Sequence, residues 1–87
     1  IIENLSPRNG EFVNLPVAIK ADIKSTKGLN KIEVYFNRRL VTGFNYYGNY
    51  YNYQYYLSEN LQSQNLIEIK AEDKLGNKAS ASIIVFH

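Results

Sequence analysis

The sequence predicts an all-β protein in which about seven antiparallel strands form a sandwich of two facing sheets. Apolar and charged residues alternate with a period of two in three separate stretches, as they do in strands with one buried face. Turn-forming residues separate the apolar runs at short and regular intervals. The alternating stretches carry charges where an amphipathic helix would need apolar residues, which argues against helices.

The stretch 17–24 shows the alternation most clearly, with apolar residues at odd positions and charged residues at 20, 22 and 24. Stretches 31–37 and 67–72 repeat this pattern. Alternate side chains of a strand point to opposite faces, so one set in each stretch should face the interior. The residues predicted to face inward are Val17, Ile19, Ala21 and Ile23, then Ile32, Val34 and Phe36, and finally Ile67, Ile69 and Ala71.

Turns divide the chain into the predicted strands. Ser25–Gly28, Asn37–Arg39 and Asp73–Asn77 have the composition of turns, and Asp73 can accept hydrogen bonds from backbone N–H groups in the last of them. We expect a single domain over residues 1–87, because the sequence shows no repeat and no linker. The predicted strands span residues 1–5, 11–13 together with 17–24, 31–37, 39–44, 50–57, 65–72 and 79–86.

The composition excludes several kinds of chemistry. The chain has no Cys, and its single His is the last residue, His87, so disulfides, thiol sites and internal histidine-based triads are excluded. The net charge of +2 is small and evenly mixed, which argues against a nucleic-acid partner. No apolar run approaches the ~20 residues of a membrane-spanning helix, so we expect no direct membrane insertion.

We expect no catalytic residue, no metal and no cofactor. The serines lack a neighbouring base, and the carboxylates alternate with lysines on outward strand faces, where cross-strand pairing explains them. A calcium ion at Glu72, Asp73 and Asn77 would need about six or more oxygen ligands, whereas this turn offers three such side chains. The segment is therefore predicted to be a structural turn.

Four segments of the chain, in this order, resemble bacterial immunoglobulin-like domains: Ser6-Pro7-x-Asn9-Gly10, Val17–Ile23, Gly28-Leu29-x-Lys31-Ile32-Glu33-Val34-Tyr35, and Ala71–Asn77. The resemblance covers residues 2–86 apart from a tyrosine-rich segment. Such domains are appended to secreted and surface proteins, including the C-terminal region of some penicillin-binding proteins. The resemblance implies an immunoglobulin-like sandwich with a noncatalytic spacing or interaction role. The sequence has Asn37-Arg38 where these domains often have Asp-Gly, which leaves the type of that turn open.

The first residues and the amino-acid usage of the chain indicate its origin. The chain begins with Ile1-Ile2 and contains no Met, and Asn, Ile, Tyr and Lys, whose codons are AT-rich, are abundant. We therefore expect a module excised from a larger bacterial protein. The resemblance implies that this protein lies outside the cell or in the envelope. Its expected partners are neighbouring domains of the same chain or another envelope protein.

The tyrosine-rich segment has a composition unlike the rest of the chain. Seven tyrosines lie within residues 46–56, interleaved with Asn, Gln and Gly. An alternating strand can bury one set, such as Tyr51, Tyr53 and Tyr55, and then Tyr50 and Tyr56 lie on the other face. Some of the phenol rings are therefore predicted to meet solvent or a partner.

Tyrosine rings beside amide groups suit more than one kind of partner. The rings give rigid contact area and the amides give hydrogen bonds, as in protein recognition surfaces, and flat rings also suit the faces of sugars. Three interpretations are open: contact with another domain or protein, binding of a glycan or peptidoglycan, and no specific role. The predicted binding residues are Tyr46, Tyr47, Tyr50, Tyr51 and Tyr53, with Arg38 and Arg39 just before the segment.

Overall fold

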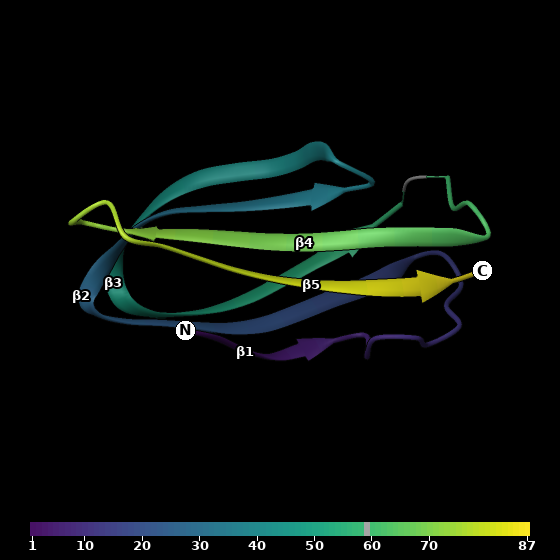
Figure 1. Ribbon diagram of the computed structural model, residues 1–87, viewed down its shortest axis with the longest axis horizontal. Coiled ribbons are helices and arrows are strands. Elements are labelled where there is room, and N and C mark those ends of the chain that lie inside the picture. The colour runs from purple at the N-terminus through teal and green to yellow at the C-terminus, as the bar shows by residue number, and fades with distance from the viewer. Residues whose placement is uncertain (59) are drawn as a thin grey trace.

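The computed structural model describes residues 1–58 and 60–87, and its strands pair antiparallel throughout (Figure 1). The predicted all-β class is thereby confirmed. Among the described residues, no helix is long and apolar enough to cross a membrane. The five strands are β1 (Ile2–Ser6), β2 (Val17–Phe36), β3 (Arg39–Leu57), β4 (Gln64–Asp73) and β5 (Lys78–Phe86).

The two longest strands, β2 and β3, pair with each other and bend together, so that each runs through both layers of the molecule (Figure 1). Residues 17–24 of β2 pair with β1 on one side and with residues 50–57 of β3 on the other. Residues 29–36 of β2 pair with residues 39–48 of β3 and with β4, which in turn pairs with β5. A single sheet therefore curls until its two parts face each other.

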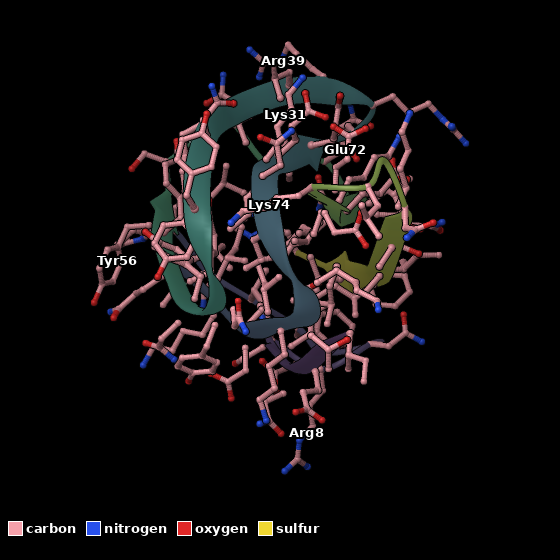
Figure 2. All side chains as sticks on the ribbon, turned by 90° about the vertical axis from the view of Figure 1, so that its left-hand side faces the viewer. Arg8, Lys31, Arg39, Tyr56, Glu72 and Lys74 are labelled. Atoms are coloured by element: carbon pink, nitrogen blue, oxygen red, sulfur yellow. The ribbon has the colours of Figure 1, made fainter. Side chains whose placement is uncertain are left out.

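A bulge explains how β2 turns this corner without leaving the sheet. Lys24 lies opposite Tyr50 and Leu29 lies opposite Gly48, so residues 25–28 of β2 face a single residue of β3. Gly28 adopts a φ of 89°, which an L-residue rarely takes. Bulges bend a strand and increase its twist while pairing continues on either side. The prediction of a turn at Ser25–Gly28 is therefore wrong, because this segment is a bend inside β2. In Figure 2 the end of the molecule that contains this bend faces the viewer.

The bends also correct the predicted number of strands. The structure has five strands in one curled sheet, not about seven in two separate sheets. The runs 17–24 and 31–37 belong together in β2, and the runs 39–44 and 50–57 belong together in β3. Residues 11–13 form no strand, although Phe12 makes an isolated parallel bridge to Phe86 of β5.

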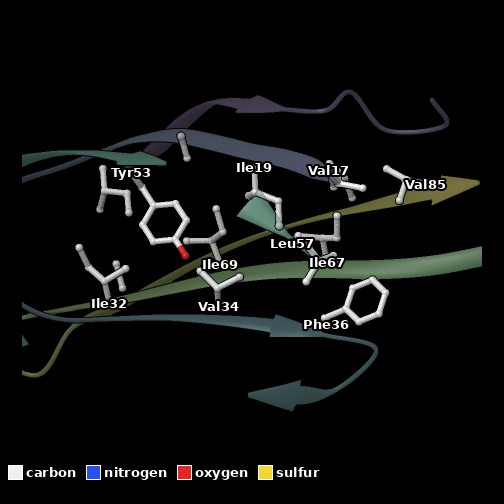
Figure 3. Close-up of a cluster of buried hydrophobic side chains, with 14 of the residues drawn as sticks. Val17, Ile19, Ile32, Val34, Phe36, Tyr53, Leu57, Ile67, Ile69 and Val85 are labelled. Atoms are coloured by element: carbon white, nitrogen blue, oxygen red, sulfur yellow. The ribbon is translucent and has the colours of Figure 1, made fainter. Parts of the chain in front are cut away.

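One apolar core lies between the two parts of the sheet (Figure 3). Every residue predicted to face inward is buried, with no side chain more than 7% exposed. Five further residues complete the core, namely Leu29, Tyr53, Leu57, Ile83 and Val85. The alternation in the sequence therefore identified the buried faces of β2 and β4 correctly.

The reversal between β2 and β3 is a two-residue hairpin turn. Phe36 lies opposite Arg39, and the two residues between them, Asn37 and Arg38, have φ angles of 49° and 69°. Two positive φ angles characterise the type I′ turn, whose usual sequence is Asn-Gly. The Asn37 side chain accepts a hydrogen bond of 2.7 Å from the Leu66 backbone N–H. The predicted tight reversal is confirmed, with Arg38 at the position that Gly usually takes.

The hydroxyl group of Tyr53 yields a prediction about stability. Tyr53 is 3% exposed, and its Oη is buried with no hydrogen-bond partner among the described residues. In Figure 3 this oxygen points into the core, toward Ile69. Burial raises the pKa of Tyr53, and the neighbouring Tyr55 and Tyr51 raise it further. We expect Tyr53→Phe to increase the free energy of unfolding by about 1 kcal/mol, because it removes an unpaired buried polar group.

Urea unfolding of the two proteins would measure this change. The matched control is Tyr50→Phe on the same strand, whose hydroxyl donates a 2.7 Å hydrogen bond to Asp22 Oδ1 and whose loss should not stabilise the protein. A lower midpoint for Tyr53→Phe than for the unmodified chain would show that the Tyr53 hydroxyl has a stabilising partner.

Candidate binding surface

The tyrosine-rich segment lies in β3, at an edge of the sheet. In the described part of the chain, β3 pairs with β2 alone, both before and after its bend. One face of β3 packs on the core and the other faces outward, because side chains alternate along a strand. The structure therefore sorts the tyrosines into an inner and an outer set.

The inner set consists of Tyr46, Tyr51, Tyr53 and Tyr55, which pack on or in the core. Tyr53 stacks nearly parallel to Phe44, with 6.3 Å between the ring centroids. Tyr46 meets Tyr51 edge-on at 4.6 Å, and the Tyr46 hydroxyl donates a 2.8 Å hydrogen bond to the backbone oxygen of Tyr50. Three of the predicted binding residues, Tyr46, Tyr51 and Tyr53, thus contribute to packing.

The outer set lies on the second half of β3, where four side chains follow one another on one face. They are Tyr50, Asn52, Gln54 and Tyr56, which we call the tyrosine–amide row. The rings at its two ends are 48% and 58% exposed, respectively. Opposite the row, β2 presents Lys24, Asp22, Lys20 and Ala18 in the same order.

Asp22 joins the row to the neighbouring strands. Its Oδ1 accepts hydrogen bonds from Tyr50 Oη at 2.7 Å and from Asn52 Nδ2 at 2.9 Å. Its Oδ2 accepts one from Asn4 Nδ2 of β1 at 2.7 Å. The hydrogen bonds from Asn4, Asn52 and Tyr50 together lower the pKa of Asp22 from 3.8 to about 2. Asp22 is therefore a carboxylate at neutral pH that links side chains of β1 and β3 to β2.

The other polar groups of the row also have partners. Gln54 Nε2 donates a 2.9 Å hydrogen bond to Tyr56 Oη, which orients the far ring. Lys24 Nζ forms an ion pair of 2.6 Å with Glu3 Oε1 and lies 6.0 Å from the centroid of the Tyr50 ring. The row is therefore an ordered surface of two exposed rings with amide groups between them.

The remaining predicted residues lie away from the row. Tyr47 is 66% exposed and precedes Gly48 at the bend of β3. Arg38 is in the hairpin turn and Arg39 begins β3, at the opposite end of the strand from Tyr56. Figure 2 shows Arg39 and Tyr56 pointing toward different sides of the molecule. The structure thus brings Tyr50 together with Lys24 and Asp22, but it does not bring Arg38 and Arg39 into that group.

Sequence reasoning missed Asp22, Asn52 and Gln54 as members of this surface. The signal was present, since the alternation that places Tyr50 and Tyr56 outward also places positions 52 and 54 outward. The pairing of this run with 17–24 was not predicted, so the position of Asp22 beside the row could not be deduced.

A second exposed surface lies on the other part of the sheet, over β2, β4 and β5. A depression of about 420 Å³ there is lined by both basic and acidic side chains, including Lys31, Glu33 and Glu72. Lys70 Nζ sits 4.7 Å from the centroid of the Tyr35 ring in the same depression. Charges of both signs alternate across it, as on a solvated sheet face.

The turn at Asp73–Asn77 uses its oxygen atoms internally. Asp73 Oδ1 accepts hydrogen bonds of 2.9 Å from the backbone N–H groups of Leu75 and Asn77, and Oδ2 accepts one of 3.0 Å from Asn77 Nδ2. Burial raises the pKa of Asp73, but these hydrogen bonds outweigh it and lower the pKa below its ordinary value. In the residues that the structure describes, no group of three or more His, Cys, Asp and Glu side chains could hold a metal ion.

The curled antiparallel sheet around a single core places the chain in the all-β class. The chain is similar to a solved structure of the fibronectin(III)-like modules of Clostridium thermocellum CbhA, with a TM-score of 0.65 and 12% sequence identity. The match covers 99% of this chain and 94% of that one. At this identity, the likeness establishes the fold alone. No protein-family model and no curated protein matches the chain.

The comparison supports part of the expected resemblance. The match supports an antiparallel β-fold of the fibronectin(III)-like kind, but not the expected sandwich of about seven strands in two separate sheets. The link to penicillin-binding proteins finds no support in these comparisons.

The hydrogen bonds around Asp22 predict a pH dependence of stability. The folded-state pKa of about 2 lies below the ordinary value of 3.8, so folding favours the carboxylate. The stability from Asp22 should therefore be complete above about pH 4 and should be lost as the pH falls from about 4 toward 2. Carbon-detected NMR titration of the carboxyl group would measure the pKa directly.

The matched variant is Asn52→Ala, which removes one donor, and it should raise the pKa of Asp22 toward 3.8. Its stability should also fall less steeply below pH 4. An Asp22 carboxyl that titrates near 3.8 in the unmodified chain would contradict the network.

Proposed function

We propose that this chain is a noncatalytic, fibronectin(III)-like module of a larger bacterial protein that lies outside the cell or in the envelope. Its role there is to space or dock neighbouring parts of that protein. The observation that carries this proposal is the fold match, which spans 99% of this chain and 94% of a chain described as CbhA fibronectin(III)-like modules.

The shape of the molecule suits a spacer. The molecule is elongated, with principal extents of 38, 21 and 17 Å. Figure 1 shows the N-terminus toward one end of the long axis and the C-terminus at the other end. A domain of this kind holds its two neighbours in a longer protein on different sides.

The titratable groups that the structure orients have structural uses. Asp22, with its pKa of about 2, is a weak base at neutral pH and already accepts three hydrogen bonds. Asp73 holds the β4–β5 turn, and His87 Nδ1 lies 3.1 Å from the carbonyl oxygen of Val13. These arrangements support a binding or spacing role more than an enzymatic one.

A module of this kind should fold without the rest of its protein. We expect residues 1–87, produced alone, to unfold in one cooperative thermal transition with equal calorimetric and van't Hoff enthalpies of about 60 kcal/mol, because the core is complete within the chain. Differential scanning calorimetry would test this. Mass spectrometry of the culture medium and envelope fractions would test the location and the size of the parent protein. A parent of only this length, or a cytoplasmic one, would refute the proposal.

A second candidate function is glycan binding, and the geometry of the tyrosine–amide row favours it. The row has exposed rings at Tyr50 and Tyr56, and the amides of Asn52 and Gln54 lie between them. Exposed rings can cover the apolar faces of sugars, while amides can bond their hydroxyl groups. Asp22 orders Tyr50 and Asn52, and the hydrogen bond between Gln54 and Tyr56 orders the other two side chains, which lowers the entropy that binding would cost.

NMR titration of the isolated chain with peptidoglycan fragments and neutral glycans would test this candidate. Binding predicts saturable amide shifts along residues 50–56, which Tyr56→Ala should abolish. The matched control is Tyr35→Ala, which removes a tyrosine from the outward face of the other part of the sheet and should leave the shifts intact. Flat titrations would eliminate the glycan candidate and leave protein docking as the use of this surface.

A further inference from the structure

β3 lies at an edge of the sheet. The far edge of β5 is partly covered, because the backbone N–H groups of Gly10 and Val13 donate hydrogen bonds of 2.6 and 2.8 Å to β5. Within the described residues, no strand pairs with β3 on the side away from β2. Its outward N–H and C=O groups can therefore pair with another strand.

The sequence of β3 lacks most of the features that usually prevent edge pairing. Proteins commonly protect exposed edges with charged residues, proline or short strands. Residues 40–58 contain no charged residue and no proline, although charged residues make up 21% of the whole chain. The strand is also 19 residues long. An identical edge could approach it without bringing like charges together.

The second half of β3 is nearly a palindrome centred on Tyr53. Reading outward in both directions, Asn52 matches Gln54, Tyr51 matches Tyr55, and Tyr50 matches Tyr56. When two copies of a strand pair antiparallel about one residue, positions equally far before and after that residue lie opposite each other. On the outer face, amides would then lie opposite amides and tyrosines opposite tyrosines. On the inner face, Tyr51 of each copy would lie opposite Tyr55 of the other.

We propose that two copies of this chain associate through the free edges of β3, paired antiparallel about Tyr53. The contact is isologous, so it uses both β3 edges and closes as a dimer instead of extending into a fibre. Cross-strand aromatic pairs of this kind stabilise antiparallel sheets. The partner is a second copy because the strand is complementary to itself. This inference does not depend on the proposed module or glycan functions.

Charge substitution at the centre of the edge tests both the dimer and its register. Asn52 and Gln54 face outward, so changing them leaves the core intact. In Asn52→Lys/Gln54→Lys, each new lysine faces another lysine of the second copy. In Asn52→Lys/Gln54→Glu, each lysine faces a glutamate, and within one chain the new groups lie opposite Asp22 and Lys20 of β2.

Sedimentation equilibrium over a range of protein concentrations is the measurement. We expect a dimer for the unmodified chain and for the Lys/Glu variant. The Lys/Lys variant should have a dissociation constant at least about tenfold higher, since two like-charge pairs form in each dimer. Thermal unfolding of each variant would confirm that it is folded. A monomer at all concentrations for the unmodified chain, or equal dissociation constants for the two variants, would overturn the proposal.

Cysteine cross-linking gives an independent readout of register, because the chain has no cysteine of its own. Directly opposed residues in an antiparallel pair have Cα atoms about 4.5–5.5 Å apart, which a disulfide can span. When Asn52→Cys and Gln54→Cys chains are mixed and oxidised, the mixed disulfide should form in preference to either homodimer. Preferential 52–52 or 54–54 cross-links would show a shifted register, and no cross-link at all would show that the edges do not meet. Either result would refute pairing about Tyr53.

Discussion

The pairing of β2 with β3 is the interaction on which the rest of the structure depends. These strands of 20 and 19 residues run together through both layers of the molecule, and the bulge before Leu29 lets them turn the corner without leaving the ladder. β1 and β4 add to β2 on its other side, and β5 pairs with β4. The two walls of the core are therefore parts of one hydrogen-bonded sheet, and the core closes as the sheet curls.

The same ladder decides which tyrosines are buried. Tyr53 lies opposite Ala21, both face the core, and the small alanine side chain leaves room for the ring. One residue earlier, Asn52 lies opposite Asp22 and both face outward, where they hydrogen-bond. Because alternation is strict over residues 50–57, the packed tyrosines and the tyrosine–amide row result from a single choice of register.

The alternation of apolar and charged residues was enough to predict the all-β class, ten of the buried core residues and the sorting of Tyr50 from Tyr53. It was not enough to predict the bends, because a bulge depends on how two strands align, and a run such as Ser25–Gly28 has the same composition in a bend as in a turn. Hydrogen bonds between residues far apart in the sequence could not be predicted either. Asn65, which is 1% exposed and hydrogen-bonds Asn37 of the β2–β3 turn, is an ordinary polar residue in the sequence.

The edge and the outer face of β3 are separate surfaces, because one consists of backbone groups and the other of side chains. Pairing two edges about Tyr53 would leave both tyrosine–amide rows exposed and would bring them side by side, with Tyr50 of each copy next to Tyr56 of the other. A glycan that contacts both rows would then bind the dimer more tightly than the monomer. By thermodynamic linkage, such a ligand must also strengthen the dimer by the same factor. Self-association and glycan binding would therefore reinforce each other if both occur, although each stands on its own observation.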